Sequence, residues 1–402
     1  KVSSDPIISC HDFGKQPLGN GFLNKEEFEK EYFFDMSIGF SKESLLLQLL
    51  EQPNKSEMFH EEYAFFSSTS QGMKKHFKKF ADDIVNSNYF NNEDKFVVEL
   101  GCNDGILIEN FCNEKIVHLG IEPSLNVANV AREKGINVIS EFFTKKLASE
   151  IIHKYGQADI FMAANVMCHI PTLNDVIEGI DLLLKPSGVL IFEDPYLGDV
   201  INKNSYDQFY DEHVFIFSAL AIQKLFDKFN MELINLEPQL THGGSMRYFL
   251  AHKGFYEKSE NVNKIINQEL DLGLNKEITF SKFSNNIKKS RKDLVELLKN
   301  IKKEGKTIAG YAATSKSTTI LNYCGIGPDL IDYITDTTPI KQNKFSPGMH
   351  IPIVDYEYFK NNPPDYAFLF AWNHSKEIME KEKDFISSGG SWITHVPEVR
   401  IL

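Results

Sequence analysis

The stretch Val97-Val98-Glu99-Leu100-Gly101-Cys102-Asn103-Asp104-Gly105 decides the fold. An apolar run of strand length leads into two glycines and then a helical pattern, and glycine lets a backbone approach a ligand without a Cβ clash. About 17 residues later, the next strand-like run ends in Glu122, where an acid can bind the two hydroxyls of a ribose. This spacing predicts an adenosine-containing ligand at the carboxyl ends of the strands.

The glycine spacing separates two kinds of cofactor. A dinucleotide fingerprint needs G-x-G-x-x-G to hold a pyrophosphate, whereas this stretch offers only Gly101 and Gly105. A tight strand–helix turn without a ligand is the simpler alternative, and the place of Glu122 argues against it. The E-x-G-x-N-x-G form resembles motif I of the class I methyltransferases, which use S-adenosylmethionine (SAM). The resemblance implies that SAM is bound by Gly101, Asn103, Asp104, Gly105, Glu122, Pro123 and Asn165.

Strand-like and helical runs alternate between residues 95 and 252, which is typical of a mostly parallel α/β sheet with helices on both faces. The two last runs, Glu232–Leu236 and Met246–Ala251, have no helix between them and predict an antiparallel pair at one sheet edge. The earlier strands are expected at Phe96–Leu100, Val117–Glu122, Ile136–Ile139, Ile160–Ala164 and Val189–Glu193.

The flanking regions differ from this pattern. The first region is turn-rich (Gly14, Pro17) and ends in a helical stretch at Ser70–Val85. A helical stretch at about Lys264–Lys303 precedes a second, smaller α/β unit. We therefore expect a module over residues 1–69, a cofactor-binding domain over 70–254, a helical connector over 255–305 and a C-terminal α/β domain over 306–402.

Composition excludes several classes of protein. The chain has 402 residues, 42% of them hydrophobic, and a net charge of −13, which argues against nucleic-acid binding through phosphate neutralisation. No run of about 18 uncharged apolar residues suggests a membrane span. Five scattered cysteines fit a reduced, cytoplasmic protein. The oligomeric state stays open.

A second motif gathers acid–base side chains. Tyr210, Glu212 and His213 place a phenol, a carboxylate and an imidazole within four residues, and His169 follows the fourth predicted strand at the same edge. A neutral imidazole is a natural general base near pH 7, and a nearby carboxylate can orient it. The alternative is that these histidines are ordinary hydrogen-bonded loop residues.

The stretch Tyr206–Ser218 is similar to the "YHEH…FS" segment of the sugar C-methyltransferases that act on nucleotide-linked keto-sugars. Matches to that family continue in order along nearly the whole chain, at Gly14–Leu18, Phe66–Ser70, Asn103–Gly105, His169–Pro171, Gly243–Arg247, Leu321–Gly325, Pro347–Ile353 and Trp372-Asn373. The resemblance implies a central class I methyltransferase domain with a Rossmann-like seven-stranded sheet, between a small N-terminal zinc-binding module and a Rossmann-like C-terminal domain that helps to hold the sugar nucleotide.

The resemblance also implies residue roles. His213 is expected to be the general base, with Tyr210, Glu212 and His169 lining the reacting sugar and Tyr63 acting as a lid residue near the methyl donor. The base would turn a 4-keto sugar into an enolate, whose carbon accepts the methyl group. The hydroxyls, the lysine and the helix N-terminal amides around Ser315 and Lys316 suit a diphosphate. An ordinary helix cap with a solvated lysine would have the same sequence pattern. The expected substrate-binding residues are Ser315, Lys316, Asp336, Lys341 and Arg247.

The zinc site of the family is altered in this chain. Serine stands at Ser3, Ser41 and Ser44, where the family has cysteines of two C-x-x-C pairs, and neutral hydroxyls replace thiolates poorly on Zn²⁺. Cys10 and His11 lack the spacing of a four-ligand cage. We expect no structural zinc.

Two other functions fit parts of this pattern. An O- or N-methyltransferase would use His213 on a hydroxyl or amine. A non-catalytic module that binds SAM or a nucleotide sugar would have no need of the acid–base set, which is intact here.

Overall fold

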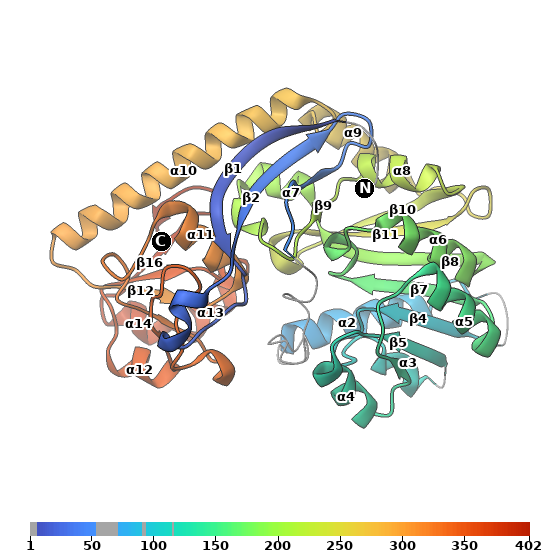
Figure 1. The fold of residues 1–402 in the computed structure, drawn as a ribbon, viewed down its shortest axis with the longest axis horizontal. Coiled ribbons are helices and arrows are strands. Elements are labelled where there is room, and N and C mark those ends of the chain that lie inside the picture. Colours follow the sequence, from blue (N-terminus) through green and yellow to red (C-terminus); the bar gives the residue numbers. More distant parts are fainter. Residues whose placement is uncertain (1–5, 54–70, 91–93, 115) are drawn as a thin grey trace.

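A seven-stranded sheet forms the centre of the computed structural model (Figure 1), which describes residues 6–53, 71–90, 94–114 and 116–402. The strand order is β10-β11-β8-β7-β4-β5-β6; β4 to β8 run parallel, and β11 is antiparallel to both neighbours. This confirms the predicted sheet with an antiparallel pair at one edge. The strands are β4 (Phe96–Leu100), β5 (Val117–Ile121), β6 (Val138–Ile139), β7 (Ala158–Ala164), β8 (Leu184–Pro195), β10 (Met231–Gln239) and β11 (Ser245–His252).

Helices cover both faces of this sheet. Successive side chains of a strand point to opposite faces, and both faces are apolar here. Val97 packs in one core with Phe80 of α2, whereas Val98 packs in another with Ile151 of α5. Fully buried strands need apolar residues on both faces, which is why they read as continuous apolar runs. The helices are α2 (Gln71–Val85), α3 (Glu109–Asn113), α4 (Leu125–Glu133), α5 (Lys145–Tyr155), α6 (Leu173–Leu183), α7 (Leu197–Lys203) and α8 (Ala219–Asp227).

The N-terminal region forms a four-stranded sheet, although its sequence reads mainly as turns. Strands β1 (Ile7–Pro17), β2 (Phe33–Ser41), β3 (Leu47–Leu49) and β9 (Phe215–Ile216) pair antiparallel. Gly14, with φ +73°, lies where the β1–β2 register shifts between Asp12 and Lys15. The glycine thus marks a bulge within a long strand rather than the end of one.

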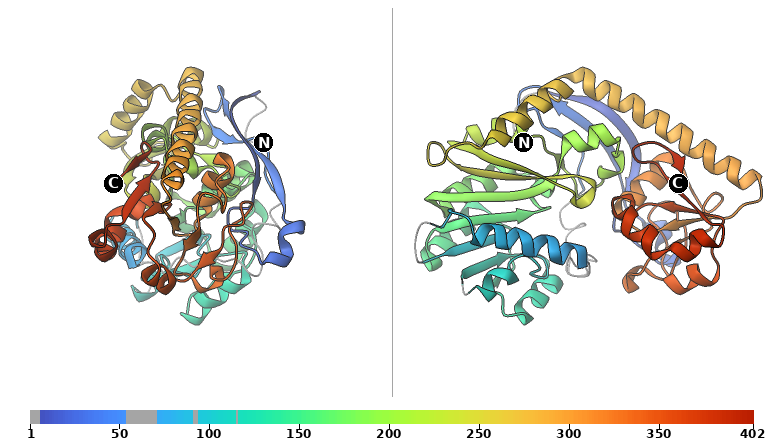
Figure 2. Two further views of the ribbon diagram at one scale, coloured as in Figure 1. Left: turned by 90° about the vertical axis from the view of Figure 1, so that its left-hand side faces the viewer. Right: turned by 180° about the vertical axis from the view of Figure 1, so that it is seen from behind.

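The connector consists of two helices rather than one. The helix α9 (Glu260–Leu272) ends at Gly273, whose φ of +77° caps it, and α10 (Glu277–Lys303) follows. The long α10 runs from the N-terminal sheet to the C-terminal domain (Figures 1 and 2). At its start Phe280 lies against Phe40 of β2, with ring centroids 4.4 Å apart. None of the helices in the described ranges has the length and apolar character needed to cross a membrane.

A six-stranded sheet builds the C-terminal domain, in the order β14-β13-β12-β15-β16-β17. All neighbours are parallel except β16 and β17. Its elements are β12 (Ile308–Tyr311), α11 (Ser315–Cys324), β13 (Tyr333–Thr335), β14 (Ile353–Val354), α12 (Tyr356–Asn361), β15 (Tyr366–Leu369), α13 (Ser375–Lys381), α14 (Lys383–Ser387), β16 (Ser391–Thr394) and β17 (Arg400–Ile401). Ligands of parallel α/β sheets bind outside the carboxyl ends of the strands, so this edge is where a site is expected.

Candidate active site

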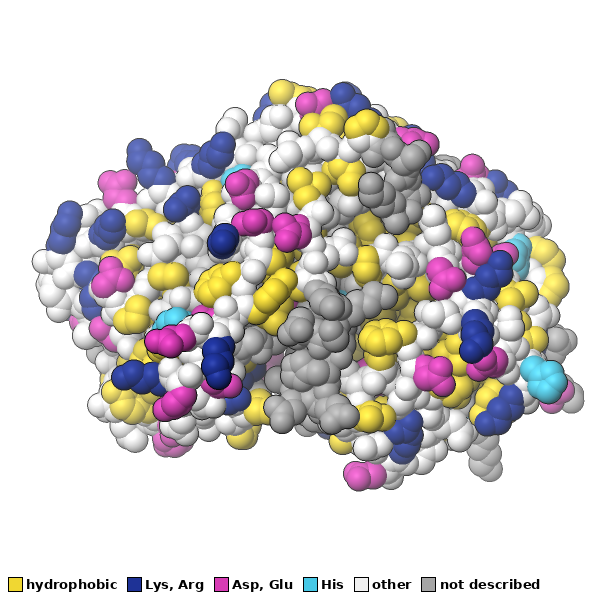
Figure 3. Space-filling view, in the orientation of Figure 1, with side chains coloured by type: hydrophobic (Ala, Val, Ile, Leu, Met, Phe, Trp, Pro, Cys, Tyr) yellow, Lys and Arg dark blue, Asp and Glu magenta, His cyan; other side chains and the backbone are white. Residues whose placement is uncertain are grey.

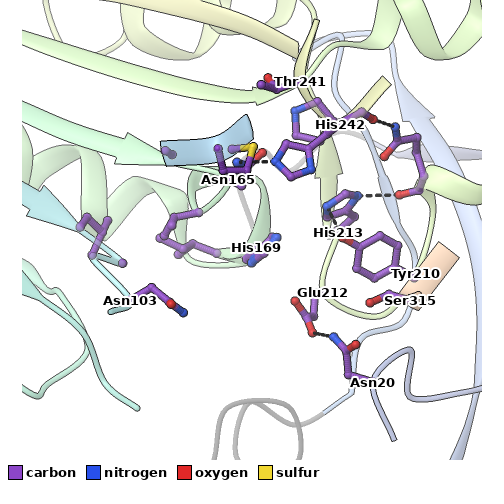
Figure 4. Close-up of a pocket in the computed structure, with 18 of the residues that line it drawn as sticks. Asn20, Asn103, Asn165, His169, Tyr210, Glu212, His213, Thr241, His242 and Ser315 are labelled. Atoms are coloured by element: carbon purple, nitrogen blue, oxygen red, sulfur yellow. Dashed lines mark hydrogen bonds between the residues drawn. The ribbon is translucent and has the colours of Figure 1, made fainter. Parts of the chain in front are cut away.

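One cavity of about 630 Å³ is lined by residues that follow parallel strands of the seven-stranded and the six-stranded sheet (Figure 4). Asn103 and Asn165 follow strands of the seven-stranded sheet, and Ser315 belongs to the C-terminal domain. Asn20 lies in the segment 18–24 that follows β1, here called the N-terminal arm. The chain therefore brings three of its parts together around one cavity.

On the face shown in Figure 3, acidic and basic side chains are interspersed.

The glycine loop borders this cavity after β4. Gly101 has φ +66°, and a Cβ there would lie 2.4 Å from Cγ2 of Val166, so both conformation and space require glycine. Asn103 also lines the cavity, whereas Asp104 and Gly105 do not: Asp104 is buried, and the α-carbon of Gly105 packs towards Ile136. The loop thus offers backbone, rather than a set of polar side chains, to the cavity.

Glu122 lies beside the loop, at the end of β5. Its Oε2 accepts the N–H of Asn103 at 3.1 Å and its Oε1 accepts the N–H of Ser124 at 2.8 Å. Burial raises the pKa of Glu122, and these two N–H groups oppose the rise. Pro123 and Asn165 line the same cavity. A cradle without a Cβ beside a fixed carboxylate acceptor fits the adenosine end of SAM.

His213 has both ring nitrogens engaged. Nδ1 lies 2.6 Å from the backbone oxygen of Gln208, and Nε2 lies 2.7 Å from the hydroxyl of Tyr210. A carbonyl oxygen can only accept, so Nδ1 carries the proton and Nε2 of the neutral ring holds the lone pair. The sequence predicted a carboxylate as the orienting group; the structure places a backbone carbonyl there.

Electrostatics keep this imidazole neutral. His213 is 4% exposed, and burial, followed by the nearby His169, holds its pKa well below the usual 6.5. The ring centroids of His169 and His213 are 5.3 Å apart, and burial lowers the pKa of His169 to about 4. Burial, then the charge of Glu212, raises the pKa of Tyr210. The cavity therefore holds a neutral imidazole beside a protonated phenol, and a neutral imidazole can accept a proton.

Glu212 is held by the N-terminal arm. Its Oε1 accepts a hydrogen bond from Nδ2 of Asn20 at 2.8 Å, and the neighbouring Asp211 accepts the N–H of Gly19 at 2.8 Å. Residues about 190 positions apart in the sequence are therefore fixed to one another beside His213. The N-terminal arm belongs to the site, which sequence reasoning did not predict.

The C-terminal domain contributes the start of α11. Thr314 caps the helix by accepting the N–H of Ser317 at 3.1 Å, and Ser315 and Lys316 line the cavity. Nζ of Lys316 donates to the backbone oxygen of His242 at 3.0 Å, and burial lowers the pKa of Lys316 to about 8. Lys341 also lines the cavity, donating to the oxygen of Ala313 at 2.7 Å.

Two predicted substrate residues lie elsewhere. Asp336 lines a neighbouring cavity of about 250 Å³ and accepts the N–H groups of Ala313 and Thr338. Arg247 is buried and does not line the main cavity. It donates to Oε2 of Glu193 at 3.0 and 3.1 Å. We therefore propose that Arg247 supports the sheet rather than the substrate. Tyr63 lies outside the described residues.

Sequence reasoning missed Gln208 and His242, which also line the cavity. Gln208 stands inside the acid–base motif, and His242 precedes the Gly243-Gly244 pair that carried the family resemblance. Those motifs were the available signal, but a glutamine or a histidine does not indicate a role in the site by its residue type alone.

The N-terminal sheet lacks the chemistry of a zinc site at the positions described. Oγ of Ser41 accepts the hydroxyl of Ser44 at 2.8 Å and the N–H of Ser44 at 3.0 Å, and both serines are buried. Burial raises the pKa of Cys10 to about 11, so it stays a thiol. Within the described ranges, the one close cluster of possible metal ligands is Cys168, His169 and His213, of which the two histidines line the cavity. Ser3 lies outside the described residues.

Metal analysis tests this interpretation. Because hydroxyls do not supply the thiolate charge that holds structural Zn²⁺, we expect the purified full chain to carry far less than one zinc per molecule by elemental analysis. Dialysis against a chelator should leave its thermal unfolding midpoint unchanged, with a mock-dialysed sample as the control. Stoichiometric zinc, or a lower midpoint after chelation, would contradict the prediction.

Three family models match successive parts of the chain. They are described as "Putative zinc binding domain" (residues 3–59), "Methyltransferase domain" (73–236) and "C-methyltransferase C-terminal domain" (240–397). Solved structures cover less of it: a SAM-dependent methyltransferase from Anabaena variabilis is 17% identical with a TM-score of 0.35, covering 44% of this chain and 84% of its own.

Two curated relatives differ in coverage. The ubiquinone biosynthesis O-methyltransferase of Colwellia psychrerythraea is 29% identical over 104 residues, which is 25% of this chain and 41% of that protein. The C-methyltransferase NovU of Streptomyces niveus is 31% identical over 400 residues, which is 99% of this chain and 95% of NovU. With near-complete coverage and all three domains matched, the chain belongs to the family of SAM-dependent C-methyltransferases that includes NovU.

Proposed function

We propose that this C-methyltransferase acts on a ring carbon next to the keto group of a nucleotide-activated 4-keto sugar. The observation that carries the proposal is the His213 tautomer, with Nδ1–H on Gln208 O and the Nε2 lone pair beside Tyr210, in a cavity shared with the cofactor loop. A carbon has no lone pair, so it must first become a carbanion equivalent. A carbonyl next to the C–H makes this possible.

His213 would carry out the proton transfer. Nε2 of His213 gives up its hydrogen bond from Tyr210 and removes the proton from the sugar C–H. The electron pair of the broken C–H bond moves towards the carbonyl oxygen of the sugar to give an enolate. The imidazolium keeps its Nδ1–H bond to Gln208 O, so the ring does not reorient. Gly101, Asn103, Glu122 and Asn165 would hold SAM, which when bound supplies an electrophilic methyl group to the enolate carbon.

The C-terminal domain would hold the nucleotide diphosphate. Ser315 and Lys316 begin α11, whose N-terminal amides and partial positive charge favour an anion. Lys341 adds a second cation on the same side of the cavity.

Hydrogen exchange distinguishes this reaction from methylation on oxygen or nitrogen. The full chain is incubated in D₂O with a panel of nucleotide 4-keto sugars and S-adenosylhomocysteine, which cannot donate a methyl group. We expect one ring hydrogen next to the keto group to exchange faster with enzyme than without it, and a carbon-bound methyl group in the product when SAM is used. A methyl group on oxygen or nitrogen, or binding without either reaction across the panel, would overturn the proposal.

The pH dependence of kcat/KM follows from the same residues. Because the pKa of His213 lies well below 6.5, the base stays neutral and kcat/KM should not fall as the pH decreases through 6.5. The pKa of Lys316 is about 8, so loss of its charge should lower kcat/KM at higher pH. Lys316→Arg should move this decline upward, since arginine stays charged. An acid decline centred at 6.5, or an alkaline decline that Lys316→Arg does not move, would contradict these assignments.

A further inference from the structure

The turn between β10 and β11 has an unusual backbone. His242, Gly243 and Gly244 have φ values of +53°, +91° and +134° in succession. Glycine adopts such values readily, but for a histidine the left-handed region is sterically unfavourable. Strain of this kind persists where surrounding contacts hold it.

The backbone oxygen of His242 accepts two hydrogen bonds. Nε2 of Gln208 donates to it at 2.5 Å and Nζ of Lys316 at 3.0 Å. The imidazole of His242 also bonds Nδ2 of Asn165 at 3.2 Å, and a Cβ on Gly243 would lie 2.2 Å from the ring of Trp372. The turn is thus held at once by Asn165, by Gln208 and by Lys316 of the C-terminal domain.

Gln208 links this turn to His213. Its side chain binds His242 O while its own backbone oxygen accepts Nδ1–H of His213 at 2.6 Å, and the residue is 1% exposed. A carbonyl cannot donate, so the side-chain nitrogen must face His242. Hydrogen bonds therefore link Lys316 to His242 O, His242 O to the side chain of Gln208, and the backbone oxygen of Gln208 to the ring of His213. Figure 4 shows how the His242 and His213 parts of this path lie in the cavity.

We propose that Gln208 and His242 are positioning residues that hold His213 in the Nδ1–H tautomer, and that Lys316 strengthens this arrangement from the C-terminal domain. The inference rests on the proposed role of His213 as the base. If Gln208 O moves away, Nδ1 loses its acceptor and the proton can move to Nε2. An imidazole protonated at Nε2 and not at Nδ1 has no lone pair facing Tyr210 and cannot remove the substrate proton.

Gln208→Met keeps the side-chain size but removes the donor, and Gln208→Glu keeps the shape while its carboxylate cannot donate to His242 O. Gln157→Met is the matched control, because Gln157 also donates to backbone carbonyls, Leu182 O and Leu184 O, away from the cavity. Ring ¹⁵N NMR of the full chain labelled on histidine reports the tautomer, with the His213 signals identified by their loss in His213→Asn.

We expect wild type and Gln157→Met to show Nδ1–H at His213, and both Gln208 variants to shift towards Nε2–H. Loss of a partner that orients a metal-ligating histidine typically lowers activity by about 10–100-fold. We expect a loss of similar size here, and it should fall on kcat with little change in either KM. An unchanged tautomer and kcat in both variants would overturn the inference. If His213→Asn were fully active, the proposed function itself would fail instead.

Lys316 provides an independent arm. Lys316→Met removes the donor that reaches His242 O from the C-terminal domain. The His213 tautomer in this variant is therefore informative even if the Gln208 variants do not fold. Combined with Gln208→Met, it should lower kcat by clearly less than the product of the two single effects, because both changes interrupt one path. Independent, multiplicative effects and an unshifted tautomer in Lys316→Met would overturn the role given to Lys316.

Discussion

Replacing His213 with alanine should leave SAM binding intact and lower the rate of methyl transfer by about 10²–10⁴-fold, the usual contribution of a general base. The reason is geometric: Nε2 of His213 holds the lone pair in the cavity, while the residues proposed to hold SAM follow other strands. Initial rates with a nucleotide 4-keto sugar measure the loss, and calorimetric titration measures SAM affinity.

Two further variants make this result interpretable. Removing a buried ring leaves a cavity that can destabilise the chain by itself, so His213→Asn is added, whose amide can still donate to Gln208 O. His252→Ala is the control: this β11 histidine bonds Asp181 and Pro186 outside the cavity and should retain full activity. A His213→Ala protein that works within threefold of wild type would exclude His213 as the base.

The central sheet could be predicted because its signals are local. Phe96–Leu100 is buried at every position, so burial on both faces leaves a mainly apolar run, broken only by Glu99, that ends at the glycine loop. The N-terminal sheet could not be predicted in the same way. Its β3 pairs with Phe215-Ile216, more than 160 residues further along the chain, and a two-residue strand has no sequence pattern of its own.

The candidate site shows the same division. The residues proposed as the base and the cofactor loop could be singled out from the sequence, because they stand together in short motifs. Their partners could not, because these depend on which strands are neighbours. Arg247 was expected at the substrate, yet it lies opposite Glu193 in the β11–β8 register, and this cross-strand pairing buries both side chains. Asn20 and His242 likewise become site residues only when distant segments meet.

Gly101→Ala should weaken SAM binding more than any equally strained glycine replacement away from the cavity. Gly325 offers the comparison: its φ is also +66°, but a Cβ there would meet nothing within 4 Å. Gly325→Ala should therefore lose only the cost of a left-handed alanine, about 1–2 kcal/mol in the free energy of unfolding. Its SAM affinity should match that of wild type.

Gly101→Ala has the same left-handed backbone strain and, in addition, a steric clash. Its Cβ would lie 2.4 and 3.1 Å from the two Cγ atoms of Val166, a β-branched side chain with little rotamer freedom, next to Asn165. Overpacking of this kind costs about 1–3 kcal/mol, which the free protein relieves by displacing the loop. Binding SAM in the native geometry restores that cost, so the dissociation constant should rise by about 5–150-fold.

Paired measurements separate the two contributions. Calorimetry gives the SAM dissociation constant of each variant, and denaturant unfolding gives its stability without ligand. If the loop is the cofactor cradle, the two alanine variants share the strain cost, but only Gly101→Ala loses affinity. Equal SAM affinities for Gly101→Ala, Gly325→Ala and wild type would mean that Gly101 is a packing glycine, and that the cofactor is held elsewhere in the cavity.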